Sequence, residues 1–164
     1  MSAVVLAVVV GSFLGVLASL RELEDSNREL SLAYMEMERA VEEIRTQNFD
    51  EVFAMYNADT SDDPGGMPEV PGSTFTLQGT LGHEAEGSAQ GTIRFPVDGK
   101  DGTYLREDLD APEFGLPRDL NGDGVIDGQN HNEDFVILPM IVRIEWTGGT
   151  SNRSVEFPIY LYDH

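Results

Sequence analysis

The sequence predicts an α+β fold in which one long N-terminal helix packs on a small antiparallel β-sheet. Apolar residues recur at alternating steps of three and four from Val9 to Ile44, which is the period of an amphipathic helix. Nearer the C-terminus, apolar and polar residues alternate, as they do in half-buried strands. The 164 residues predict three parts: an apolar helical segment (1–20), its amphipathic continuation (21–57) and a β-sheet head with one modest core (58–164).

The helix is expected to begin in an apolar run. Residues 3–20 are eighteen consecutive residues without a charge, near the lower limit of about 17 to 25 for crossing a bilayer. Three interpretations stay open: a retained membrane helix, a cleaved signal peptide and a buried helix of a soluble assembly. A signal peptide normally begins with a cationic stretch, which does not precede this run.

The amphipathic continuation is expected to extend the same helix to Tyr56, where an acidic loop rich in Gly and Pro ends it. A coiled coil is one possible use of the stripe, with Asn27 as its polar register position. The flanking positions are mostly acidic and would repel an identical parallel neighbour. A wide apolar face favours packing on a sheet instead. The stripe and the residues that widen it are Val9, Phe13, Val16, Leu20, Leu23, Asn27, Leu30, Tyr34, Met37, Val41 and Ile44, with Leu32, Met35 and Ala40.

Four segments of the head alternate as strands do. The last two flank a Gly-rich turn at residues 147–152 and predict an antiparallel hairpin. A sheet of about four strands against the helix is the expected product. The four segments are residues 73–77, 91–95, 135–146 and 153–162.

The segment 135–146 predicts which face of the sheet is buried. Arg143 and Glu145 are expected to point to a wet face, opposite the apolar residues. Pro139 and Pro158 lack the N–H of a ladder bond, which favours edge positions or strand starts. The residues expected on the buried face are Met140, Val142, Ile144 and Trp146.

The charge and the missing motifs exclude several functions. Thirty acidic against ten basic residues give a net charge of −20, which would repel nucleic acid. There is no cysteine, phosphate-binding loop or nucleophile elbow, and no small-molecule substrate is indicated, so we do not expect an enzyme. The three histidines are interpreted as inert surface residues. The acidic group Glu107, Asp108 and Asp110 is interpreted as a solvated loop rather than a catalytic carboxylate pair.

One segment, residues 118–130, carries the spacing of a calcium loop. Alternating Asp and Asn side chains bring three oxygens together, and Gly124 permits the sharp turn. The twelfth position, Asn130, replaces the usual bidentate Glu. Glu133 or Asp134 would then complete the coordination shell of the ion. We predict a weak structural calcium site, with a dissociation constant of about 10⁻⁴ to 10⁻³ M. The alternative is a Gly- and Asp-rich turn without an ion. The candidate ligands are Asp119, Asn121, Asp123, Val125 through its carbonyl, Asp127, Asn130, Glu133 and Asp134.

These features resemble the type IV pilin and type II secretion pseudopilin family. The local match lies in residues 4–20 and in the run Leu32-Ala-Tyr-Met-Glu-Met-Glu-Arg-Ala-Val-Glu-Glu-Ile-Arg, which is similar to the helix of minor pilin-like subunits. The loop 119–127 is similar to the calcium loops of pseudopilin heads. The family begins with a basic leader, a processing glycine and a Phe-Thr-Leu-x-Glu run. None of these is present, and we expect the true helix to begin upstream of Met1.

The resemblance implies a structural function. The chain would be a filament subunit, anchored in the bacterial inner membrane with its head outside the cytoplasm and then added to a pilus or pseudopilus at the cell surface or in the periplasm. Its partners would be other pilin-like subunits and the assembly machinery. Met37, Val41 and Ile44 would lie under the sheet of the head. The alternative is a membrane-anchored extracytoplasmic binding or adhesion domain that does not polymerise.

Overall fold

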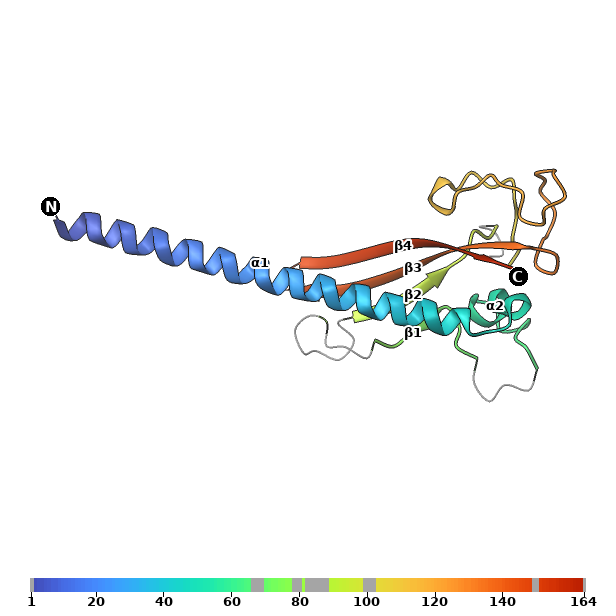
Figure 1. Cartoon of the computed structure of the whole chain (residues 1–164), viewed down its shortest axis with the longest axis horizontal. Helices are drawn as coiled ribbons and strands as arrows, with labels where there is room; N and C mark the ends of the chain where they lie inside the picture. The colour runs from blue at the N-terminus through green and yellow to red at the C-terminus, as the bar shows by residue number, and fades with distance from the viewer. Residues whose placement is uncertain are drawn as a thin grey trace.

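A computed structural model shows a long helix lying along one face of a four-stranded antiparallel sheet, which confirms the predicted α+β class (Figure 1). The structure describes the backbone of residues 2–65, 70–77, 81, 89–98, 103–148 and 151–163, and side chains from Phe13 onward. The side chains of the first twelve residues, including the predicted stripe position Val9, lie outside the described residues.

The predicted single helix is two helices. Helix α1 spans Ser2–Arg45 and helix α2 spans Phe49–Tyr56. At the end of α1 the N–H groups of Thr46 and Gln47 bond to the carbonyls three residues back, which tightens the last turn. Asn48 then adopts an extended conformation and begins α2. The apolar pattern continues across the break, so the pattern alone did not reveal it.

Helix α1 packs on the sheet through its C-terminal half. Met37, Val41 and Ile44 are buried there, as the resemblance implied. Ala40, which was expected to widen the stripe, is also buried, and so is Ala33, which was not expected there. Leu30 and Tyr34, which were expected in the stripe, are 40% and 46% exposed, so the buried face is shifted from the predicted one.

The four strands form a simple meander in the order β1-β2-β3-β4, with every neighbouring pair antiparallel. The predicted hairpin is present and longer than expected, because its register pairs Gly148 with Ser151. Residues 149 and 150 of the predicted turn lie outside the described residues. The strands are β1 (Thr74–Phe75), β2 (Ala89–Arg94), β3 (Ile137–Gly148) and β4 (Ser151–Tyr162).

On one face of the sheet, helix α1 covers strand β3 but leaves Phe157 of β4 52% exposed, and the opposite face is partly covered. Strand β3 buries the four predicted residues and Leu138 on the helix side. The opposite face was expected to be wet, but Ile141 on that face is only 2% exposed. The segment between β2 and β3 lies over this end of the sheet and buries its own Phe114 and Leu116 (Figure 1). A layer without regular strands therefore covers part of the face that the alternation predicted to be solvated.

The two strand prolines occupy positions that are compatible with the ladder. Pro158 lies on β4, the last strand of the sheet. Pro139 lies on β3 beyond its pairing with β2, which ends at the pair Arg94 and Ile141. Both agree with the expected confinement of proline to edge positions.

The N-terminal half of α1 projects away from the head (Figure 1). Its apolar side chains are open to solvent, with Phe13 62% and Leu23 60% exposed. Within the described part of the chain, no helix combines the length and apolar character needed to cross a membrane.

Candidate metal site

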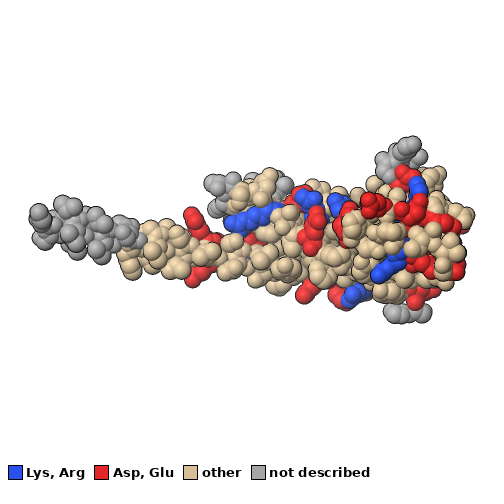
Figure 2. Space-filling model, turned by 90° about the horizontal axis from the view of Figure 1, so that it is seen from above, with Lys and Arg blue, Asp and Glu red and all other residues tan. Residues whose placement is uncertain are grey.

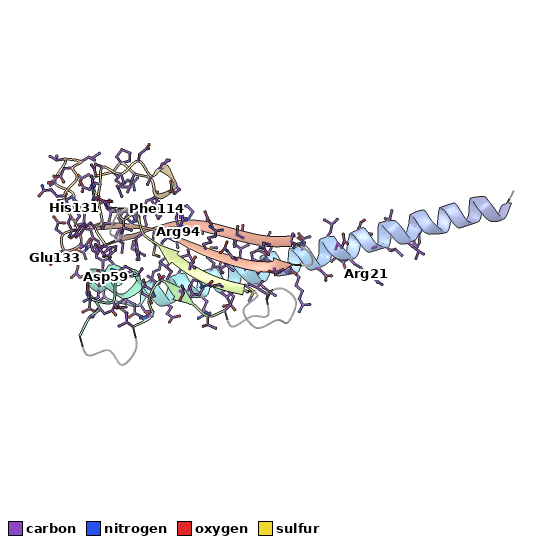
Figure 3. The ribbon with its side chains drawn as sticks, turned by 180° about the vertical axis from the view of Figure 1, so that it is seen from behind. Arg21, Asp59, Arg94, Phe114, His131 and Glu133 are labelled. Atoms are coloured by element: carbon purple, nitrogen blue, oxygen red, sulfur yellow. The ribbon has the colours of Figure 1, made fainter. Side chains whose placement is uncertain are left out.

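The candidate site lies at the end of the head farthest from the projecting part of α1, where His131 and Glu133 are found (Figure 3). Three loop segments meet there: residues 103–109, 118–127 and 130–136. Backbone hydrogen bonds join them, because the His131 N–H donates to the Leu105 carbonyl and the Val136 and Ile137 N–H groups donate to the Leu120 carbonyl. The last contact connects the site to the start of β3.

The predicted loop uses its acidic side chains to hold its own turns. The carboxylate of Asp119 accepts hydrogen bonds from the N–H groups of Gly122 (2.6 Å) and Gly124 (2.8 Å). Asn121 and Asp123 each accept from the N–H two residues on. Gly124 has a φ of 85°, which is the left-handed conformation that its place in the pattern predicted. The oxygens of the loop therefore project from a chain that is already folded into successive turns.

The carboxylate of a buried glutamate accepts hydrogen bonds from backbone N–H groups of this loop. Glu107 is fully buried, and its Oε1 accepts hydrogen bonds from the N–H groups of Leu120 (2.6 Å) and Asn121 (3.2 Å). Its Oε2 accepts from the N–H of Asp127 at 3.2 Å. The interpretation of Glu107 as part of a solvated acidic loop was wrong, because three backbone donors replace the water that a buried carboxylate loses.

His131 was also misassigned to the surface. It is 4% exposed, with Nδ1 3.0 Å from Asp134 Oδ1 and Nε2 3.3 Å from Asp127 Oδ1. A third carboxylate, that of Glu107, lies 3.8 Å from Nε2. Burial disfavours the charged imidazolium, but the hydrogen bond to Asp134 and the negative charge of Glu107 outweigh it, so the pKa of His131 is raised.

Glu107, Asp127 and His131 form a group that could hold a metal ion. Each offers one ligand atom, and these atoms lie within 4.8 Å of one another. The pKa of Asp127 is lowered, chiefly by hydrogen bonds from the backbone and side chain of Gln129, so its carboxylate stays ionised. Two carboxylates and an imidazole are common ligands for divalent cations, but they do not by themselves select calcium.

The remaining predicted ligands differ in their relation to the loop. Asp134 lies beside it, because its Oδ2 accepts a hydrogen bond from the Asn121 side chain at 3.3 Å. Asn130 is exposed, and its side-chain oxygen accepts from the N–H of Asn132 in a local turn. Glu133 is also exposed, and Val125 directs a half-exposed side chain to solvent while its N–H donates to Asp123. Glu133 and Asp134 were the two candidates to complete the coordination shell, and Asp134 lies closer to the loop.

The surface around the site is acidic. Figure 2 shows Asp and Glu side chains gathered over the head end of the molecule, where they outnumber Lys and Arg. Arg106, one of the cations in this region, is bound by Asp98 at 2.8 Å and Asp108 at 2.7 Å. The electrostatic field at this end therefore attracts cations toward the loop.

Sequence reasoning missed Glu107 and His131 for a common reason: neither belongs to the spaced calcium pattern. A signal for Glu107 was present, since it alternates with Leu105 and Leu109 and therefore shares their side of an extended chain. For His131 the signal was weaker. It lies four residues after Asp127 and three before Asp134, but the sequence did not show that these segments fold around it.

Comparison of the chain with protein-family models, with curated proteins and with solved structures gave no match.

Proposed function

We propose that this chain is a structural subunit of a filament of the type IV pilus or type II secretion pseudopilus kind. Its helix would hold it in the inner membrane before assembly, and its head would face the outside of the cytoplasm. In the filament, the projecting halves of neighbouring helices would pack together and the acidic heads would remain in solvent.

The division of α1 into two unlike halves is the observation that carries this proposal. A helix of 44 residues is about 66 Å long at 1.5 Å per residue. The head covers its C-terminal half, where Met37 and Ile44 are 3% and 1% exposed, and leaves Phe13 to Leu23 bare. Bare apolar side chains along several turns are costly in water, because each loses about 1.5 to 3 kcal/mol relative to burial. A lipid phase or other helices would remove that cost.

We further propose that the loop at 119–127 binds calcium and that the ion stabilises the head. The donor chemistry favours a hard cation, since four side chains of the loop supply carboxylate or amide oxygens. Asp119, Asn121, Asp123 and Asp127 would bind directly, and Asp134 would close the shell. The role is structural, because the loop is tied through Leu120 to the first residues of β3.

Cysteine cross-linking in the intact membrane tests the filament function. The chain has no cysteine, so each introduced thiol is a unique reporter. Phe13 and Leu20 lie seven residues apart on one stripe, which corresponds to about 10 Å along the helix. In a filament of axially staggered subunits, a thiol at 13 of one copy can meet a thiol at 20 of another, and the double variant Phe13→Cys/Leu20→Cys should give a ladder of multimers on oxidation.

The single variants Phe13→Cys and Leu20→Cys are matched controls, because one thiol per chain can link only two copies. Ser61→Cys, on the exposed surface of the head, controls for random collision. A product that stops at the dimer in the double variant would contradict polymerisation and favour a paired helix. A product that stays monomeric in all variants would favour the anchored binding or adhesion domain.

A further inference from the structure

The buried carboxylate of Glu107 accepts hydrogen bonds from both ends of the loop at 119–127. Leu120 and Asn121 lie near the start of the loop and Asp127 is its ninth position. All three donate their backbone N–H groups to this one carboxylate. We propose that Glu107 is a positioning residue that holds the loop in its cation-binding shape without itself being a ligand of the ion. The inference rests on the proposed calcium site.

The hydrogen bonds of the carboxylate argue against a direct bond from Oε1 to the ion. Oε1 already accepts two N–H groups, which uses both of its lone pairs. Oε2 accepts the N–H of Asp127 and lies 3.8 Å from His131 Nε2. An ion bound through Oε1 would displace bonds that are buried from water, and an unsatisfied buried N–H costs about 1 to 3 kcal/mol.

Glu107 is itself firmly placed, which a positioning residue requires. Its backbone carbonyl accepts from the N–H of Arg118, just before the loop. Two residues earlier, Leu105 is fully buried and its N–H donates to the Asn132 side chain at 2.8 Å. The carboxylate is therefore fixed between the two segments that flank the loop and keeps its ends at a constant separation.

Preformed geometry matters at this site because Asp119, Asp123 and Asp127 place three negative charges on one short loop, and their repulsion is not offset when no cation is bound. A loop with free ends would relieve that repulsion by opening, and calcium would then have to restore the turn at a cost in affinity. Residues that support metal ligands in this way typically change affinity by about 10- to 100-fold when they are replaced.

Calcium and terbium binding to the full-length protein in detergent tests the proposal. Glu107→Gln removes one acceptor oxygen and the charge while keeping the size of the side chain. We expect it to weaken calcium binding by about 10- to 100-fold in calorimetry. The number of water molecules on bound terbium, obtained from luminescence lifetimes in H₂O and D₂O at saturation, should not change. Glu113→Gln, which removes a charge from an exposed residue of the 3-10 helix η1 (Pro112–Phe114), is the matched control and should bind like the wild type.

The outcomes separate this inference from the proposed calcium site. Wild-type protein that binds neither ion would overturn both. Wild-type binding with an unchanged affinity in Glu107→Gln would overturn the positioning role alone. An additional water on terbium in the variant would identify Glu107 as a ligand. Loss of zinc binding in both Glu107→Gln and His131→Gln, with calcium binding unchanged, would instead assign the glutamate to an imidazole-containing site.

Hydrogen exchange of the wild type provides a second test that does not depend on whether the variant folds. A preformed loop requires that the amides of Leu120, Asn121 and Asp127 be protected in calcium-free protein nearly as well as in the calcium-loaded form. Exchange of these amides at the rate of an unstructured chain, with protection only after calcium is added, would refute the role.

Discussion

Replacement of Glu29 should detach the outer end of the β3–β4 hairpin from α1. One carboxylate oxygen of Glu29 accepts hydrogen bonds from Trp146 Nε1 at 3.0 Å and from Arg153 Nη1 at 2.9 Å. These bonds join the helix to both strands of the hairpin near the point where the helix leaves the head. The perturbation is Glu29→Ala, with Glu29→Gln as the variant that keeps an acceptor for Trp146.

The structure sets the size of the effect. Trp146 is 3% exposed, so removal of its acceptor leaves a buried N–H unsatisfied, at a cost of about 1 to 3 kcal/mol. The side chain of Arg153 is 32% exposed and can be solvated again, so its ion pair with Glu29 contributes no more than about 1 kcal/mol. Glu29→Ala should therefore lower the free energy of unfolding by about 2 kcal/mol, and Glu29→Gln should lower it by less than about 1 kcal/mol.

Trp146 is the only tryptophan of the chain, so its fluorescence reports the contact directly. Urea unfolding followed by this emission should show the loss of stability, and acrylamide should quench Trp146 more strongly in Glu29→Ala than in the wild type. Glu22→Ala, an exposed glutamate on the same helix, controls for the change in charge and helix propensity. Equal stability and equal quenching in Glu29→Ala and Glu22→Ala would refute the reasoning.

Three further predictions concern the core and the loop. Leu138→Ala should destabilise the head by about 2 to 5 kcal/mol in urea unfolding because the side chain is fully buried, whereas Val136→Ala, on a partly exposed neighbour, should cost much less. Gly124→Ala forces a side chain into a positive φ and should lower the free energy of unfolding of the head, measured in urea, by about 1 to 2 kcal/mol, since the loop holds this conformation in the calcium-free protein; an unchanged stability would contradict the assignment of the turn. Calcium at 100 times its dissociation constant should stabilise the folded head by about 2.7 kcal/mol, seen as a higher unfolding temperature that EDTA reverses, and Asp119→Asn should reduce that shift.

The helix and the hairpin were predictable because each depends on a local period. The residues of β3 alternate between buried and more exposed side chains from Val142 to Trp146, and a register slip by one residue would move Val142, Ile144 and Trp146 to the opposite face. The break between α1 and α2 was not predictable from the same signal. Residues Thr46 to Asn48 contain neither Gly nor Pro, and the chain ends the helix there because α2 must turn to place Phe49 and Phe53 against Phe135.

The candidate site was predictable only in part. The turns at Asp119 and Gly124 follow from residue types within one short segment, so the sequence identified them. Glu107 and His131 depend on contacts between segments 13 to 24 residues apart in the chain, and a single sequence does not display such contacts. The same limit explains why the irregular layer over Ile141 was missed.

The hydrogen bond between Glu29 and Trp146 joins residues 117 positions apart, which has a consequence for synthesis. A ribosome adds about 5 to 20 residues per second, so α1 would be synthesised roughly 6 to 23 seconds before the hairpin that covers its C-terminal half. During that interval the whole stripe is uncovered, from the part that stays bare in the finished head to the part that ends under the sheet. Nascent chains are therefore most vulnerable to aggregation before their last strands are made, and a binding factor that shields α1 at this stage would have to release its C-terminal half when β3 and β4 emerge.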